Sequence, residues 1–443
     1  MKYNQAINNA TWIVACKIAQ SVLQLIVGML SARYLGPANY GLINYAASVV
    51  AFALPLMRLG LNATLVHEFV ETPEKEGEIM GTALVLNISS SILCIFGVSA
   101  FAYAANLEDT TAIAVCVLYS FSLLFAAVEM IQYWYQYKLM AKYSSLVMFF
   151  AYVIVSIYKI GLLITSKSVY WFAVTNSLDF GIIGFVLIFI YFKKSSSRFS
   201  FSLQRAKVML SKSKHYILSA LMVVLFQSTD HIMLTSMSGV TENGFYTAAI
   251  TCAGVFQFVY TAIIDSFRPM ILNAKKENSS DYNSFISRLY CIIIYVALAQ
   301  SLVFTVFSKT IISILYGEGY LESIPVLRIL VWYLAFSYMG SVRNVWILAE
   351  QKQKYLWIIN LSGAVFNIAL NAVLIPLLGA SGAALASLLT QLFANFVLGF
   401  ILKPIRKNNR LMLVGLNPKF ILNEIKNILS ILKDTVRNKR KRS

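Results

Sequence analysis

The sequence predicts an all-α membrane protein with about twelve transmembrane helices, in two pseudo-symmetric six-helix lobes around a central cavity. Two observations predict the membrane class. The chain is 58% hydrophobic and 13% charged, with a mean hydropathy of +0.69, whereas a soluble domain carries about 25% charged residues. Apolar runs of about 20 residues, the length that crosses the hydrocarbon core, also recur along the whole chain. A repeated glycine pattern predicts the two lobes.

The glycine pattern occurs twice, 203 residues apart. Gly36, which precedes Pro37, lies five positions before Gly41, and Gly239 lies five positions before Gly244. Each pair interrupts an apolar run, which then restarts with aromatic and small residues. Glycine accepts positive φ without steric cost, so each pair suits a tight hairpin. A repeat of this length in a hydrophobic chain is typical of transporters built from two related halves.

Twelve spans follow from the apolar runs, with ends placed to within a few residues. They are 11–32, 41–63, 79–105, 112–134, 146–165, 169–192, 216–238, 244–267, 289–308, 324–348, 355–378 and 381–402. The domains expected are a lobe at 1–195, a basic cytoplasmic linker at 196–209, a lobe at 210–405 and a basic tail at 406–443. Apolar residues recur at helical spacing in the tail, which predicts an amphipathic helix bound to membrane lipids.

The distribution of lysine and arginine predicts the orientation. Of 37 such residues, 29 lie in the termini and in the loops on the same side as the termini, and three lie in the opposite loops. Cytoplasmic loops collect these residues, so both termini are expected in the cytoplasm. Five glutamates at 68–78 lie on the same side, but carboxylates weigh little in this rule. Topology and the basic tail explain the net charge of +18, and no nucleic-acid partner is expected.

The chain has no recognisable catalytic motif. We find no phosphate-binding loop, dinucleotide fingerprint, zinc-protease motif or nucleophile elbow. The five cysteines lie in or at the edge of apolar runs without metal-type spacing, and we expect them to pack in the core. They are Cys16, Cys94, Cys116, Cys252 and Cys291. We therefore predict no catalytic residues, no metal and no cofactor.

Polar residues within the spans are the candidate functional residues, because charges in hydrocarbon are costly and usually face a wet cavity. Lys17, Gln20 and Gln24 form a stripe on the first helix and are expected to line the cavity. The alternative is that small residues on the stripe merely let helices approach closely, and that Lys17 snorkels to the interface.

Other charged residues within the spans or directly at a span end are less clear candidates. They are Arg58, Lys159, Asp179, Asp230 and Arg268. Arg58 lies near a span end, where snorkelling also explains it. Lys159 and Asp179 form either a structural ion pair or part of a transport site, and Arg268 pairs with Asp265 at i and i+3 in the simplest interpretation. Asp230 lies deeper and is the better functional candidate of the second lobe.

Four segments together resemble a known family. The segments are 34–41, 230–249, 316–330 and 367–384, and the best of them contains Asn367, Asn371 and Pro376. Their order and spacing resemble the polysaccharide-repeat-unit flippases of the Wzx type (O-antigen or capsule), which belong to the multidrug/oligosaccharidyl-lipid/polysaccharide exporter (MOP) superfamily. The resemblance covers roughly residues 8–400.

The resemblance implies twelve to fourteen helices in two lobes and alternating access in the bacterial cytoplasmic (inner) membrane. It implies export of polyprenyl-diphosphate-linked oligosaccharide for cell-surface polysaccharide biosynthesis, with the polysaccharide polymerase machinery as a further partner. Charged cavity residues vary between members, so none is transferred to this chain. Coupling to a proton or sodium gradient, through Asp230 or Asp179, stays open.

Three alternatives exist, and the polar stripes on the helices disfavour one of them, a purely structural scaffold. A multidrug or cation antiporter of the same superfamily would share the fold but should have an anionic cavity. A membrane glycosyl polymerase or ligase would be an enzyme with a sizeable outer loop, and this chain has only short loops on that side. We therefore predict a transporter rather than an enzyme.

Overall fold

The computed structural model describes residues 2–195 and 197–418, and these residues form helices and no strand. This confirms the all-α class. The helices of the first part are α1 (Lys2–Arg58), α2 (Leu61–Glu71), α3 (Glu76–Ala105), α4 (Thr110–Ser120), α5 (Ser122–Glu129), α6 (Gln132–Tyr137), α7 (Ala141–Ile164), α8 (Val169–Ala173), α9 (Thr175–Lys194), α10 (Leu203–Ser238) and α11 (Val240–Ala253). Those that follow are α12 (Gln257–Lys276), α13 (Tyr282–Val306), α14 (Ser308–Leu315), α15 (Ser323–Ala349), α16 (Lys354–Leu392), α17 (Leu398–Ile401) and α18 (Arg406–Gly415).

Ten helical stretches of the described chain are long and apolar enough to cross a membrane. Two of them, Ala19–Glu71 with 53 residues and Lys354–Ile401 with 48 residues, are long enough for two crossings each, because one crossing takes about 20 residues. Non-helical backbone at Gly36 and at Gly379 divides these two stretches. The ten stretches therefore accommodate the twelve predicted spans.

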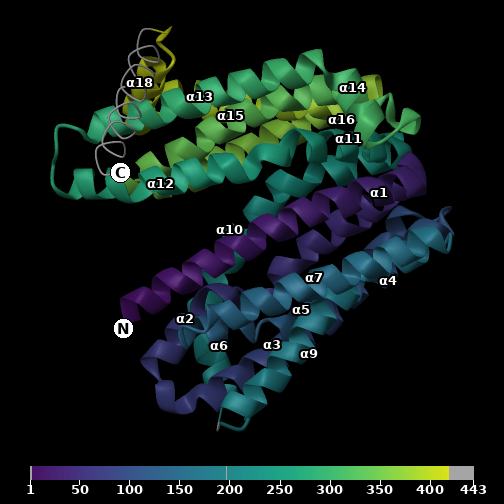
Figure 1. Ribbon diagram of the computed structural model, residues 1–443, viewed down its shortest axis with the longest axis vertical. Helices are drawn as coiled ribbons and strands as arrows, with labels where there is room; N and C mark the ends of the chain where they lie inside the picture. Colours follow the sequence, from purple (N-terminus) through teal and green to yellow (C-terminus); the bar gives the residue numbers. More distant parts are fainter. Residues whose placement is uncertain (1, 196, 419–443) are drawn as a thin grey trace, which may run out of the picture. The chain divides into compact units, whose positions relative to one another are not determined.

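The chain divides into two compact units. The first comprises Met1–Ala248 with Ser313–Glu322, and the second comprises Ala249–Ile312 with Ser323–Ser443. The division after Ala248 comes later than the boundary expected at 196–209, because α10 packs along α1 and also contacts α2 and α3 (Figure 1). By packing, α10 belongs to the first unit, while the lobes 1–195 and 210–405 stay a prediction about the repeat.

The segment predicted as a linker is docked on α3. Residues 197–202 form no helix, Ser202 has extended backbone, and α10 then begins at Leu203. The amide of Ser200 donates to the Gly77 carbonyl (3.2 Å), and that of Ser202 donates to Thr82 Oγ1 (3.1 Å). A Cβ on Gly77 would lie 2.1 Å from the Arg198 carbonyl oxygen, so only glycine permits this approach.

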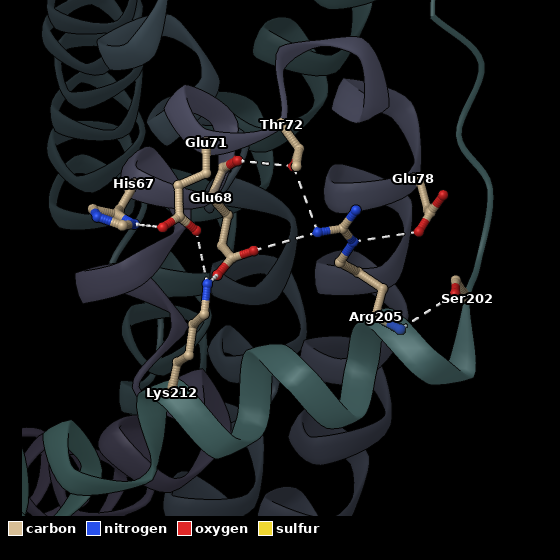
Figure 2. A network of polar contacts seen from close by, with 8 residues as sticks. All are labelled: His67, Glu68, Glu71, Thr72, Glu78, Ser202, Arg205 and Lys212. Carbon is tan, nitrogen blue, oxygen red and sulfur yellow. Dashed lines mark hydrogen bonds and ion pairs between the residues drawn. The ribbon is translucent and has the colours of Figure 1, made fainter.

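A charge network continues this contact into α10, as Figure 2 shows. Lys212 Nζ lies 2.7 Å from Glu68 Oε1 and 2.7 Å from Glu71 Oε2. Arg205 lies 3.6 Å from Glu68 and 3.3 Å from Glu78. Glu68 is only 1% exposed, so its charge depends on these two cations. The glutamates at 68–78 are an exception to the positive-inside pattern. Three of them thus form the surface on which Arg205 and Lys212 dock.

The hydrophobic core of the first unit has two parts. One surrounds Tyr45 and Met57 of α1, and the other surrounds Phe69, Trp134 and Tyr191. All five cysteines are free, four of them buried and Cys94 half-buried, which agrees with a packing role.

In the second unit, an ion pair ties the ends of three helices. Glu350, just after α15, accepts from Lys275 Nζ (2.7 Å) and from the Tyr282 hydroxyl (3.0 Å). Burial alone would raise the pKa of Glu350, but these hydrogen bonds hold the pKa below its ordinary value. Beyond α17 the chain turns through Lys403–Ile405 into α18. The rest of the predicted amphipathic tail, from residue 419, lies outside the described residues.

We predict that Glu68→Gln destabilises the protein by about 3 kcal/mol, because removing one partner of a buried ion pair leaves the other charge uncompensated. Thermal unfolding of detergent-solubilised protein measures the change. The matched control is Glu74→Gln in the same segment, since Glu74 is exposed and forms no ion pair within the described chain and should change stability by less than about 0.5 kcal/mol. Equal effects of the two variants would show that the network does not stabilise the docked linker.

Candidate functional site

The two glycine hairpins have the same backbone conformation. Gly36 has φ 69° and ψ 171°, and Gly239 has φ 94° and ψ 167°. Residues other than glycine rarely adopt this positive φ. In both copies a helix restarts at the next residue, Pro37 or Val240. The first glycine of each predicted pair therefore breaks the helix.

The second glycine of each pair allows the hairpins to touch. A Cβ on Gly41 would lie 1.8 Å from the Val240 carbonyl oxygen, and a Cβ on Gly244 would lie 2.0 Å from the Pro37 carbonyl oxygen. Pro37 and Val240 occupy the same position in the two copies, directly after the first glycine. The contact is thus reciprocal, and each copy of the repeat presents a glycine to the backbone of the other.

A polar clasp, made of Asn243 and its partners, holds this contact. Asn243 Nδ2 donates to the Gly41 carbonyl (2.8 Å), and His231 Nδ1 lies 2.7 Å from Asn243 Oδ1. Because that oxygen can only accept, the hydrogen-bond network assigns the proton to His231 Nδ1. The Thr247 hydroxyl donates to the Asn243 carbonyl (2.7 Å). Asn243 is completely buried. The clasp therefore joins α10 and α11 to the hairpin at Gly41 by hydrogen bonds.

The segment Ser313–Glu322 covers the same hairpins. The Tyr320 hydroxyl donates to the Ala32 carbonyl (2.7 Å). Its ring packs edge-on against Tyr40 and Phe245, with centroids 6.4 and 6.3 Å away. Arg33 donates to the carbonyls of Ser313 and Ile314. The motif at 316–320, found from its resemblance to the family, therefore seals the paired hairpins.

The predicted cavity residues differ in burial and in how far the structure describes them. The Lys17 side chain lies outside the described residues, while Gln20 is half-buried and Gln24 is exposed on α1. Asp230 is buried and accepts from the Tyr246 hydroxyl (2.9 Å), so part of its role is to hold α10 against α11. The stripe on α1 and Asp230 stay predictions as substrate contacts.

The remaining charged candidates carry two interpretations from the sequence, snorkelling for Arg58 and ion pairs for Arg268 with Asp265 and for Lys159 with Asp179. Arg58 lies 3.5 Å from Glu129, and Arg268 lies 3.0 Å from Asp265. Both arginines therefore have structural partners. Lys159 and Asp179 form no ion pair within 4.0 Å in the described chain, although their helices α7 and α9 pack together. Asp179 Oδ1 is buried and has no hydrogen-bond partner among the described residues.

The asparagines of the best family segment lie together within α16. Asn371 Nδ2 donates to Asn367 Oδ1 (3.1 Å), and both side chains are buried. Pro376 lies inside the same helix, three residues before the break at Gly379. The two asparagines are thus paired within the helix before the break, and Pro376 lies beside the break.

An apolar pocket of about 490 Å³ lies between α1, α3 and α10. Its lining includes Phe52, Leu93, Gly97, Phe101 and Ile232. Because almost no polar atom lines it, the pocket suits a hydrocarbon chain and not a sugar.

A family model described as polysaccharide biosynthesis protein matches residues 6–275. The chain belongs to this family. The resemblance found in the sequence is thereby confirmed at the level of the family. None of the curated proteins searched matches the chain.

Solved structures show the fold of this family member. The lipid II flippase MurJ in an inward closed conformation superposes with a TM-score of 0.68 and 15% identity, over 91% of this chain and 90% of that chain. An inward-facing multidrug resistance MATE transporter of the MOP superfamily gives 0.67 and 14%, over 90% and 96%. A MOP superfamily transporter from Pyrococcus furiosus, reported to have a binding pocket of reversed polarity, gives 0.59 and 14%, over 93% and 96%. The chain therefore shares the fold of these three proteins.

We predict that Gly41→Ala and Gly244→Ala each destabilise the protein by about 1–3 kcal/mol, because the added methyl group collides with backbone that cannot easily move. The control is Gly97→Ala, since a Cβ on Gly97 meets nothing within 4 Å, and alanine favours a helix over glycine. The midpoint of thermal unfolding in detergent compares the three variants. If Gly97→Ala costs as much as the other two, the close contact between the hairpins is wrong.

Proposed function

We propose that this protein is a flippase that moves polyprenyl-diphosphate-linked oligosaccharide repeat units from the cytoplasmic to the outer leaflet by alternating access. The observation that carries the proposal is the match over 6–275 to the polysaccharide biosynthesis protein family. The fold likeness to a lipid II flippase supports it. The products would be cell-surface polysaccharides such as O-antigen or capsule, made together with the polysaccharide polymerase machinery.

The chemistry of this substrate suits the polar stripe on α1. A diphosphate sugar is an anionic, polar head that hydrocarbon rejects, while its lipid tail can stay in the bilayer. Lys17 would neutralise the head, and Gln20 and Gln24 would hydrogen-bond to it. With the inside negative, moving one charge is worth about 2.3 kcal/mol per 100 mV. Outward passage of the anion and return of the empty cationic carrier are then both favoured.

The paired hairpins support a mechanism with a gate. The glycine contacts bring backbone against backbone, and Asn243 adds one hydrogen bond across them. Opening such a gate also requires Tyr320 to leave its contacts with Tyr40 and Phe245, and α10 to part from α1 near the hairpins. In alternating access, separation of the hairpins would open the cavity to the outer side. Coupling to a proton or sodium gradient is a further option for the return step.

A multidrug antiporter is the second candidate, because MATE transporters share the fold. It requires carboxylates to dominate the cavity so that cations bind. In the first unit, Asp230 accepts from Tyr246 and Glu129 faces Arg58, which leaves Asp179 as the carboxylate with a buried oxygen that has no hydrogen-bond partner in the described chain. One carboxylate would not dominate a cavity, so we favour the anionic substrate.

Our first functional prediction concerns Lys17. In cells that lack the gene, lipid-linked repeat units should accumulate on the cytoplasmic leaflet, and the wild-type chain should clear them. We expect Lys17→Ala to reach normal membrane levels but to export about tenfold more slowly, the effect of losing one charged hydrogen bond of about 1.5 kcal/mol. Lys17→Arg should retain more activity, and Lys167→Ala, in an exposed loop, should behave as wild type. Unchanged export by Lys17→Ala would remove Lys17 from the substrate site, and absence of any accumulated lipid-linked sugar would contradict the function itself.

A second prediction tests the orientation. The start of α3 lies beside the docked linker, and its other end leads into the loop that contains Glu108. Since α3 has 30 residues, which is about 45 Å of helix, these two sites lie on opposite faces of the membrane. We expect a membrane-impermeant thiol reagent on intact cells to label Glu108→Cys and not Ser200→Cys. The reverse labelling would place both termini outside.

A further inference from the structure

α18 follows the last predicted span and is held by its buried face. Hydrogen bonds join it to α13 and to the preceding π-helical segment Phe393–Val397. They link Tyr290 to Asn408 (3.0 Å), Asn409 to the Phe396 carbonyl (2.7 Å), Ser287 to the Leu411 carbonyl (3.2 Å) and Tyr295 to the Leu416 carbonyl (3.0 Å). Asn408 and Asn409 are completely buried, so the rotation of α18 about its axis is fixed.

Close contacts confirm this placement. A Cβ on Gly415 would lie 2.8 Å from Tyr290 Cβ and 2.9 Å from the Cys291 amide nitrogen. A Cβ on Gly399 would lie 2.1 Å from Asn409 Oδ1. α18 thus crosses α13 near the start of that helix, with glycine at the crossing point, and cannot turn a different face outward without losing these contacts.

The opposite face of α18 is exposed and combines cations with aliphatic side chains. The exposed residues are Arg406, Lys407, Arg410, Leu413 and Val414. Their spacing of i, i+1, i+4, i+7 and i+8 places them on one side of a helix. Lys352 Nζ donates to the Pro404 carbonyl (2.7 Å), which holds the turn between α15 and α16 close to the start of α18. Two more exposed cations, Lys354 and Lys403, therefore lie near this face.

The positive charge of this face is not balanced within the described chain. None of its cations forms an ion pair with a carboxylate there. Arg406 and Lys407 lie in the first turn of the helix, where the helix dipole disfavours cations. Ile405 at the N-cap gives no side-chain hydrogen bond to the first amides. An external anion would therefore satisfy both the cations and the helix start.

We propose that the exposed face of α18 binds the headgroups of anionic membrane lipids and anchors the end of the second unit at the membrane surface. The lipid phosphate would lie against Lys407 and Arg410, and one acyl chain would lie against Leu413 and Val414. An interfacial helix binds through this combination of cations and apolar side chains. A free phosphate would use the cations only and would leave the two aliphatic side chains in water. The proposal is independent of which molecule the protein transports.

The test uses full-length protein in a neutral detergent. Short-chain phosphatidylglycerol, short-chain phosphatidylcholine and free glycerol phosphate are titrated separately, and the midpoint of thermal unfolding is measured. The variant is Lys407→Gln/Arg410→Gln. Its matched control is Lys207→Gln/Lys214→Gln, which removes two exposed cations of α10 that form no ion pair in the described chain. The charge-retaining variant Lys407→Arg/Arg410→Lys shows whether the site folds normally.

We expect phosphatidylglycerol to stabilise the wild-type protein, the control and the charge-retaining variant at similar concentrations. Each removed cation should weaken the response about fivefold, so the Lys407→Gln/Arg410→Gln variant should need roughly 25-fold more lipid. An equal response of this variant and the control would overturn the proposal. A response to phosphatidylcholine as large as that to phosphatidylglycerol would also overturn it, and so would one to glycerol phosphate.

Discussion

The contact between the two glycine hairpins constrains the rest of the first unit. Helices pack side chain to side chain at about 8–10 Å between axes, whereas here a backbone carbonyl of each hairpin lies where the Cβ of Gly41 or Gly244 would be. Once the backbones are this close, the break within α1, the end of α10 and the start of α11 must meet at one place. Asn243 can then reach the Gly41 carbonyl, and Tyr320 can pack between the two hairpins.

A second constraint acts at the other end of α10. The carboxylate of Glu68 is buried, and its charge is compensated by Lys212 and Arg205. The segment before α10 packs against Gly77. α10 is therefore held to the first unit at both ends, by glycine contacts and hydrogen bonds at one and by charges at the other. This explains why the packing division comes after Ala248, although the sequence repeat begins a new half earlier.

The sequence predicted those features that depend on neighbouring residues. The spans follow from local hydropathy, and the helix breaks follow from Gly36 and Gly239. Features that join distant residues were not predicted. Asn243 contacts Gly41 across 202 positions and Lys212 contacts Glu68 across 144. The position of Asn243, a polar residue directly before Gly244 in an apolar stretch, was a sequence signal for its role. The five glutamates opposite a basic linker were a signal for the network, but electrostatic pairing cannot be assigned without the fold.

The structure also changes which polar residues are available to a substrate. A buried charge is tolerated when it is paired or hydrogen-bonded, and a residue in such a role is costly to recruit for transport. Asp230, Arg58 and Arg268 each have a partner. On α1, Gln20 is half-buried and Gln24 is exposed. An alternating-access carrier needs polar side chains that can exchange water for substrate in each cycle. The two glutamines of the stripe meet this requirement better than the paired charges do, and this favours a substrate that hydrogen-bonds to amides, as the proposed sugar head would.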